Sequence, residues 1–187
     1  MWAYVKDGSI VQTNTSQTRL VIRGTEFPAK YANEWTVQQK KDYGVYEVVE
    51  DSTNLKDGAY YINGASTFTF SSDTVTLAYA SATAKNSDDV TVDGITTPGL
   101  KSQQKEKIKS QAHGLLSDTD WYASRKAETD KAIPSEVATY RAALRTKEND
   151  MKTLVDGAAD VDALAALYEY TGDSATRPLG EWPDPVS

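Results

Sequence analysis

The sequence contains no cysteine, only one histidine and only two methionines among its 187 residues. Without cysteine, disulfides, thiolate catalysis and cysteine-based zinc sites are excluded. No stretch approaches the roughly 20 apolar residues that a membrane-spanning helix needs. The opening residues, MWAYVKDGSI, lack the basic segment and apolar run of a signal peptide. We therefore expect neither membrane insertion nor export, and the chain is compatible with a cytosolic origin.

Excess positive charge is also missing, because the net charge is -7. Nucleic acids and anionic membranes both require a basic surface, so neither is an expected partner. The glycine-rich phosphate loop, the G-x-G-x-x-G fingerprint and the G-x-S-x-G nucleophile motif are absent as well. A hydrophobic content of 39% is nevertheless ordinary for a globular chain, and the length suits one domain or two small ones.

Candidate catalytic groups are sparse. His113 lies on a predicted helix, where its neighbours three and four positions away include no carboxylate that could orient it. Pairs of carboxylates occur where turns or helix caps favour aspartate, at Asp118 with Asp120, Asp88 with Asp89, and Asp160 with Asp162. None of these pairs matches a calcium-binding loop. The residues therefore predict no enzyme, no cofactor and no metal site.

The N-terminal residues 1–83 are predicted to form a mostly-β domain of short antiparallel strands with one short helix. Asp7-Gly8 and Asn63-Gly64 are both strong hairpin signals, because such pairs accept the positive φ of a tight turn. The helix is expected within 31–43, with Thr36 as a cap and Gly44 at its end. The expected strands cover residues 2–6, 9–13, 19–23, 45–49, 59–62, 67–70 and 74–79.

Residues 84–99 are predicted to be a linker, because they are rich in Asp, Asn, Ser, Thr, Gly and Pro. A short strand within them is expected at 90–92. From residue 100 the composition changes to helical patterns, so residues 100–187 are predicted to form a helical domain with a proline-rich tail. The complete chain is thus assigned to the α+β class.

The first helix of this domain is expected at 100–116, with a thin apolar stripe that needs a covering surface. That surface is either the following helical hairpin or a second copy of the same helix. Ile133-Pro134 should open the second arm of the hairpin, with Pro134 at its first helical position. Further helices are expected after Asn149 or Asp150 and at 161–168, and Trp182 is the expected anchor of the tail.

Residues 115–145, LLSDTDWYASRKAETDKAIPSEVATYRAALR, carry a family resemblance. A leucine-rich helix end, an aspartate followed by an aromatic pair, an Ile-Pro step and a Y-R-x-x-L-R run follow one another there. This segment resembles the C-terminal region of tailed-phage tail assembly chaperones, also called tail fibre assembly proteins. The closing RPLGEWPDP is similar to the proline-rich end of marine-phage versions, and Tyr4 to Gly8 is similar to their opening hairpin.

The resemblance implies a non-enzymatic helper that binds the distal part of a tail fibre and shields it until the fibre trimer forms. Such a protein would act in the host cytoplasm during phage assembly. The residues expected to bind the fibre are Leu115, Leu116, Trp121, Tyr122, Arg125, Tyr140, Arg141 and Leu144.

Two alternatives remain at this point. A virion component, such as a fibre-tip adaptor or a receptor-binding adhesin, would suit the mostly-β first half. The second alternative is an unrelated enzyme that acts on polysaccharide through His113 and nearby acidic residues.

Overall fold

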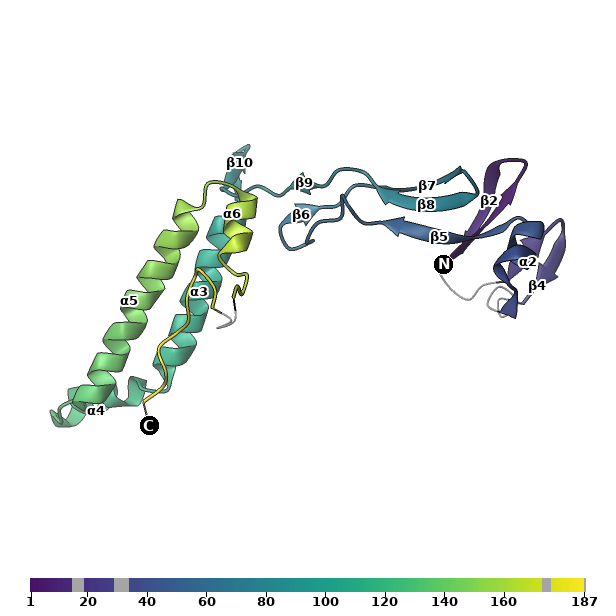
Figure 1. The fold of residues 1–187 in the computed structure, drawn as a ribbon. Helices are drawn as coiled ribbons and strands as arrows, with labels where there is room; N and C mark the ends of the chain where they lie inside the picture. The colour runs from purple at the N-terminus through teal and green to yellow at the C-terminus, as the bar shows by residue number, and fades with distance from the viewer. Residues whose placement is uncertain (15–18, 29–33, 173–175, 187) are drawn as a thin grey trace. The chain divides into compact units, whose positions relative to one another are not determined.

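The computed structural model describes residues 1–14, 19–28, 34–172 and 176–186. The chain forms two compact units, Met1–Thr83 and Ala84–Ser187. The first unit is built mainly from strands, and the second contains the long helices (Figure 1). The predicted α+β class is therefore confirmed.

The first unit is organised on a five-stranded sheet with the order β2-β1-β5-β8-β7. Its outer hairpins are antiparallel, but β5 pairs with β8 in parallel, with Val48 opposite Val75. A parallel pair requires a long connection, which here carries β6 and β7. The strand bounds are β1 Trp2–Lys6, β2 Ser9–Asn14, β5 Val45–Asp51, β7 Ser66–Ser71 and β8 Thr74–Tyr79.

The hairpin predicted at Asp7-Gly8 is confirmed. Lys6 lies opposite Ser9, and both turn residues have positive φ, 50° for Asp7 and 75° for Gly8. A second small hairpin joins β3 (Leu20–Ile22) to β4 (Thr25–Phe27). The predicted strand at 19–23 matches β3, but its return strand was not anticipated.

The hairpin predicted at Asn63-Gly64 is wrong. The preceding strand, β6 (Tyr61–Ile62), pairs with β9 (Thr83–Ala84), and β7 pairs with β8 around a turn at 72–73. The Asn63 side chain instead bonds both backbone groups of Lys56, each at 2.8 Å. Gly64 lies so close to Ala80 that a Cβ atom would be 2.7 Å from the Ala80 carbonyl oxygen. This Asn-Gly pair therefore orders a loop and permits a close approach of two chain segments.

Both faces of β1 are buried, which explains its apolar composition. Tyr4 packs in one cluster with Ile22 and Val45, bordered by Trp2, Phe27 and Trp35. Ala3 and Val5 point to the opposite face. There they pack with Val75 in a second cluster, bordered by Ile10, Tyr46, Val48, Phe68 and Phe70.

The short helix α2 (Val37–Asp42) begins at the predicted cap. The Thr36 hydroxyl accepts from the Gln39 backbone N–H at 3.2 Å, and the Gln39 side chain accepts from the Thr36 N–H at 2.9 Å. This reciprocal pair satisfies two otherwise unpaired donors. Part of the predicted range, residues 31–33, lies outside the described residues.

The second unit centres on α3 (Leu100–Ser117) and α5 (Ser135–Gly157), which lie side by side (Figure 1). The apolar stripe of α3 is buried at Leu100, Ile108 and Ala112, with Gln104 beside it. Lys105 and Asp156 form an ion pair between the two helices at 2.7 Å. The thin stripe that required a covering surface thus finds one in α5 of the same chain. The shorter helices are α4 (Asp120–Thr129) and α6 (Val161–Ala166).

Helix α5 is longer than predicted. It continues through Asn149 and Asp150, where we expected a new helix to begin, and Pro134 precedes it as the N-cap instead of occupying its first turn. The buried residues keep one helical face across the expected break, so packing outweighs the local preference of Asn and Asp for caps. These residues are Val137, Tyr140, Leu144, Met151 and Val155.

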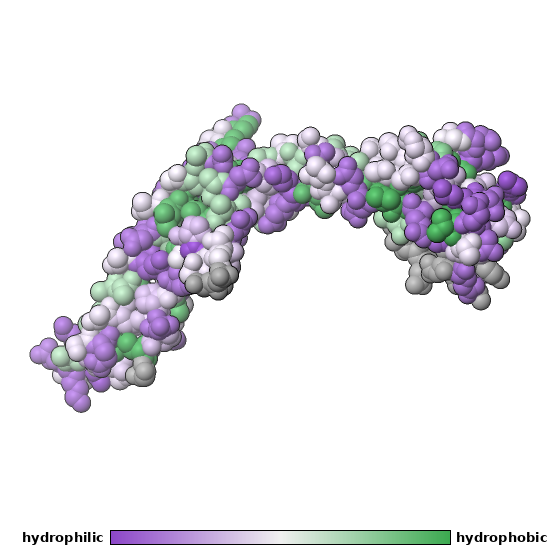
Figure 2. All heavy atoms as spheres, viewed as in Figure 1, coloured by the Kyte–Doolittle hydropathy of each residue, from purple (hydrophilic) through white to green (hydrophobic). Residues whose placement is uncertain are grey.

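Residues 84–99 cluster with the helical unit and contain a hairpin of β10 (Val90–Val92) and β11 (Ile95–Thr97). The predicted strand at 90–92 is confirmed. The tail returns to the same unit, where the Trp182 indole N–H donates to the Gln111 side chain at 3.2 Å and Leu179 is buried. Figure 2 shows that hydrophobic residues also reach the surface of both units.

Candidate interaction surface

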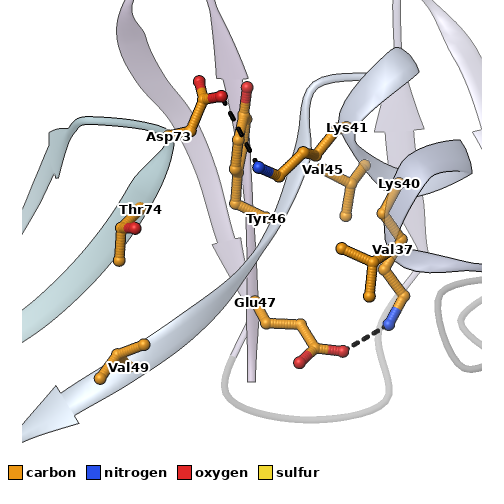
Figure 3. A pocket seen from close by; sticks show the side chains of 9 residues that line it. All are labelled: Val37, Lys40, Lys41, Val45, Tyr46, Glu47, Val49, Asp73 and Thr74. Carbon is orange, nitrogen blue, oxygen red and sulfur yellow. Dashed lines mark hydrogen bonds and ion pairs between the residues drawn. The ribbon is translucent and has the colours of Figure 1, made fainter.

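The first unit carries a shallow groove of about 160 Å³ between α2 and β5 (Figure 3). Its apolar lining includes Val37 and Val49, which are 66% and 56% exposed. Two ion pairs cross its rim, from Lys40 to Glu47 at 2.6 Å and from Lys41 to Asp73 at 3.6 Å. The groove could admit one aliphatic side chain, but its balanced charges select no particular ligand.

The residues expected to bind a fibre all lie in the second unit, around the connection from α3 through α4 to α5. Folding therefore brings the two ends of the 115–145 segment together. Leu115 and Leu116 are half-buried near the end of α3. Of the other predicted residues, three lie on α4 and three lie on α5. The α4 residues are Trp121, Tyr122 and Arg125, and the α5 residues are Tyr140, Arg141 and Leu144.

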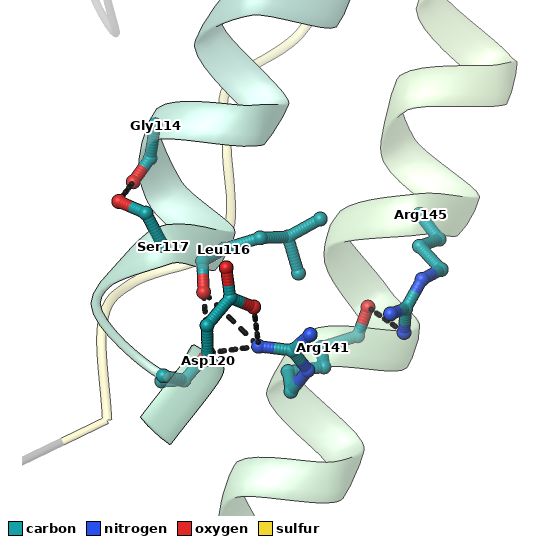
Figure 4. A network of polar contacts seen from close by, with 7 residues as sticks. Gly114, Leu116, Ser117, Asp120, Arg141 and Arg145 are labelled. Carbon is teal, nitrogen blue, oxygen red and sulfur yellow. Dashed lines mark hydrogen bonds and ion pairs between the residues drawn. The ribbon is translucent and has the colours of Figure 1, made fainter. Parts of the chain in front are cut away.

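Arg141 ties this connection together from within (Figure 4). Its Nη1 atom lies 3.0 Å from the Leu116 carbonyl oxygen, 2.6 Å from the Thr119 hydroxyl and 2.9 Å from an Asp120 carboxylate oxygen. Its side chain is only 12% exposed. The Thr119 hydroxyl donates to the same Leu116 carbonyl at 2.9 Å. Arg141 therefore fixes the start of α4 against α5, and we call this set of contacts the Arg141 clamp.

From the sequence, either Asp118 or Thr119 could cap the helix that follows, and Thr119 is the residue that directly precedes α4. Its side chain makes no capping hydrogen bond, however, because its hydroxyl is engaged in the Arg141 clamp. Asp120 in the first turn supplies a favourable charge for the positive end of the helix dipole. The tertiary contact thus replaces the local cap.

Helix α4 contains no buried residue and displays an aromatic–arginine cluster of Trp121, Tyr122 and Arg125. The two ring centroids are 3.9 Å apart. The Arg125 guanidinium carbon lies 4.7 Å from the Trp121 centroid and 5.1 Å from the Tyr122 centroid, within the range of cation–π attraction. Trp121 is 52% exposed. Tyr122 and Arg125 are half-buried. The Arg141 clamp fixes the start of the helix, and Trp121 is the accessible member of the cluster.

Tyr140 and Leu144 serve a different purpose. They are 7% and 0% exposed, and they belong to the buried stripe of α5. Such residues contribute to the core of the helical unit and are not accessible for direct contact with another molecule. The accessible part of the predicted site is accordingly concentrated on α4.

In the described part of the chain, the ionisable groups with a shifted pKa each take part in a hydrogen bond. His113 is exposed on α3, and among the described residues no three acidic or histidine side chains are placed to hold a metal. Each perturbed group has an adjacent structural cause. Hydrogen bonds lower the pKa of Glu47 through Lys40, of Asp51 through Thr53 and of Asp89 through Gly99, and they raise the pKa of Tyr79 through Glu50.

Sequence reasoning missed two features of this part of the molecule. One is the clamp, since nothing in the sequence places Arg141 beside Thr119. The other is the exposed hairpin β10–β11, although Asp93-Gly94 between two apolar residues is the same signal that identified the first hairpin.

Comparison of the chain with protein-family models, curated proteins and solved structures gives no match. In the parts of the chain that the structure describes, no helix is both long enough and apolar enough to span a bilayer.

Proposed function

We propose that this chain is a non-enzymatic chaperone of tail fibre assembly, which binds the distal part of a fibre polypeptide through the aromatic–arginine cluster. The observation that carries the proposal is the exposure of Trp121 beside Arg125 on a helix fixed by internal contacts. Trp, Tyr and Arg are the residues that most often dominate binding energy at protein interfaces. The resemblance of residues 115–145 to tail assembly chaperones supports the choice of partner.

The physical task of such a chaperone fits an exposed cluster of this kind. Fibre strands that have not yet trimerised present unpaired edges and apolar surface, both of which promote aggregation. A partner that covers this surface reversibly needs a small, rigid anchor more than a large interface. Acting before the particle is complete, the chain would be located in the host cytoplasm.

Co-expression with a candidate tail fibre polypeptide tests the proposal. The intact chain should raise the yield of soluble, trimeric fibre, measured by size-exclusion chromatography. Trp121→Ala should abolish most of that gain, because truncation of a central aromatic anchor typically costs about 2 kcal/mol or more of binding.

Leu154→Ala is the matched control, because Leu154 is also an exposed apolar side chain of this unit, at 41%, and lies outside the cluster. It should leave the fibre yield unchanged. Circular dichroism should show that both variants keep their helices and strands. An unchanged fibre yield with Trp121→Ala, or collapse of the whole chain in that variant, would contradict the proposed role of the cluster.

A second candidate function is a structural part of the virion, either a fibre-tip adaptor or an adhesin. The open groove beside α2 in the β-rich first unit favours it, since an assembly helper needs no such surface there. Purified particles distinguish the two functions. A virion component would be found at fibre stoichiometry, whereas a chaperone would be absent from mature particles.

A further inference from the structure

In the described part of the helical unit, the hairpin β10–β11 presents an exposed apolar face. Its register places Val92 opposite Ile95 and Val90 opposite Thr97, so these four side chains share one face. Val90, Val92 and Ile95 are 38%, 62% and 74% exposed. Hydrophobic residues are visible at the projection that carries β10 (Figure 2). Exposed aliphatic residues of this kind on one face of a hairpin indicate a binding surface.

The hairpin is held firmly at its base. The backbone N–H groups of Leu100 and Lys101 donate to the carbonyls of Asn86 and Ser87, both at 2.9 Å. The Gly99 N–H donates to the Asp89 carboxylate at 2.8 Å. These bonds join the hairpin to the first turn of α3. The exposed face therefore stands on an anchored support and does not result from a loose loop.

One edge of the hairpin is open to a further strand. Asp93 and Gly94 form a two-residue turn with positive φ, so the adjacent pair Val92 and Ile95 exchanges the hairpin's own hydrogen bonds. The next pair, Thr91 and Thr96, is therefore a non-hydrogen-bonded pair of the ladder, in which the backbone N–H and C=O groups point away from the partner strand. Its close spacing agrees with the 2.8 Å separation of the two threonine hydroxyls.

The two edges are not equivalent. On β11 the next outward position is Pro98, which has no N–H to donate, and proline at such a position blocks strand addition. On β10 the outward positions are Asp89, Thr91 and Asp93. Among the residues that the structure describes, β10 pairs with β11 alone. The edge of β10 is thus the one that can accept another strand.

We propose that β10 accepts an extended, basic strand of the fibre polypeptide as a third strand of this hairpin. The proposal rests on the proposed function and adds a second contact to the aromatic–arginine cluster. Three observations support it: the outward backbone groups of β10, the apolar face beside them, and the negative charge of the hairpin. Residues 86–97 carry three aspartates and no lysine or arginine. Asp88 is paired with Lys101 at 3.4 Å and Asp89 accepts from the Gly99 N–H at 2.8 Å, so Asp93 is the aspartate best placed to attract a basic strand.

A second copy of this chain is a poor occupant of the same edge. Two antiparallel β10 strands related by a two-fold axis at Thr91 would place Asp93 of one opposite Asp89 of the other. Like charges in directly opposed positions destabilise a strand pair. A heterologous strand with Lys or Arg avoids the repulsion and gains attraction.

The test compares Thr91→Pro with Thr96→Pro in the full-length chain. Both changes remove the hydroxyl pair, and both replace an outward N–H that the hairpin does not use internally. Only Thr91→Pro blocks the β10 edge. With the same candidate tail fibre polypeptide as the probe, Thr91→Pro should weaken binding about tenfold, and Thr96→Pro should change it by less than about twofold. Cross-strand contacts in NMR spectra should show that both hairpins persist.

A charge variant provides an independent measurement. Asp93→Asn keeps a residue that tolerates the left-handed turn conformation, but removes one negative charge. It should weaken binding at low ionic strength and reduce the salt dependence of the affinity. Unchanged salt dependence would contradict the basic character assigned to the partner strand.

The possible outcomes separate the proposed function from the strand-addition proposal. If the unmodified chain does not bind the fibre polypeptide, the proposed function and the strand-addition proposal both fail. If it binds and the two proline variants bind alike, only the strand-addition proposal fails. If the chain alone forms a dimer in sedimentation experiments that Thr91→Pro dissociates, a second copy occupies the edge and the proposal is overturned.

Discussion

Arg141 belongs to a segment that resembles a partner-binding region, yet its contacts are internal. Three oxygens from the end of α3 and the start of α4 converge on its Nη1 atom. Its guanidinium offers several donors in a rigid plane, which suits a position where carbonyl, hydroxyl and carboxylate oxygens meet. Arg141 thus holds α4 in place, and in the proposed function Trp121 is the residue that contacts the partner.

Removal of this side chain should destabilise the second unit. Arg141→Ala leaves the Leu116 carbonyl and Thr119 hydroxyl without the donor they share, and we expect a loss of about 2 kcal/mol of unfolding free energy. Arg145→Ala is the control, because Arg145 is exposed and makes only one long contact, at 3.4 Å, to the Arg141 carbonyl. Its effect should stay below about 0.5 kcal/mol. Urea unfolding measures both, and equal effects would count against the clamp.

At the scale of elements, the connection between β10–β11 and α3 depends on a carboxylate. The Gly99 N–H, with further help from the Ser102 side chain, lowers the pKa of Asp89. Glycine is required at position 99 because a side chain there would clash with the backbone of Asp88. The segment expected to be a linker is thus joined to the first turn of a helix by a charge-assisted bond.

This bond predicts a pH dependence with a definite sign. Because the folded-state pKa of Asp89 is lowered, its contribution to stability is complete above about pH 4, the unfolded-state value. The contribution is lost as the pH falls through the lower folded-state value. Asp89→Asn should therefore reduce the difference between the urea midpoints of the second unit at pH 7 and pH 3. An unchanged difference would show that Asp89 titrates alike in both states.

At the scale of the whole molecule, the chain separates into two units with their own buried clusters. The first unit buries both faces of β1, and the second buries the facing stripes of α3 and α5. We propose that the β-rich unit and the helical unit are independent domains, so that the partner surface on α4 does not need the sheet in order to fold.

Separate expression of residues 1–83 and 84–187 tests this independence. The 84–187 fragment should show helical circular dichroism and a cooperative unfolding transition, with a midpoint close to that of the helical signal in the full chain. It should also retain binding to the fibre polypeptide. A disordered 84–187 fragment would mean that its core is incomplete without the first unit.

Much of the local structure followed from the sequence, because short-range rules governed it. Asp7-Gly8 determined a hairpin through its positive φ values, and Thr36 with Gln39 determined the start of α2 through a capping box. The apolar spacing from Leu100 to Ala112 determined the buried face of α3. The exposed Trp121 and the half-buried Tyr122 were predicted as site residues from their residue types and from the family resemblance.

Tertiary structure decided what depends on residues distant in sequence. Asn63-Gly64 has the composition of a hairpin turn, but the pairing of β7 with β8 and the approach of Ala80 gave it another role. Asn149-Asp150 suggested a break, but the continuous buried stripe kept α5 intact. Likewise, only packing brought Arg141 to Thr119 and left β10 with an open edge. The sequence by itself determined most of the elements and the class of the fold, but it did not reveal β4, β11 or the unbroken length of α5. Their pairing and exposure required long-range contacts, whose energies exceed the local preferences that the sequence displays.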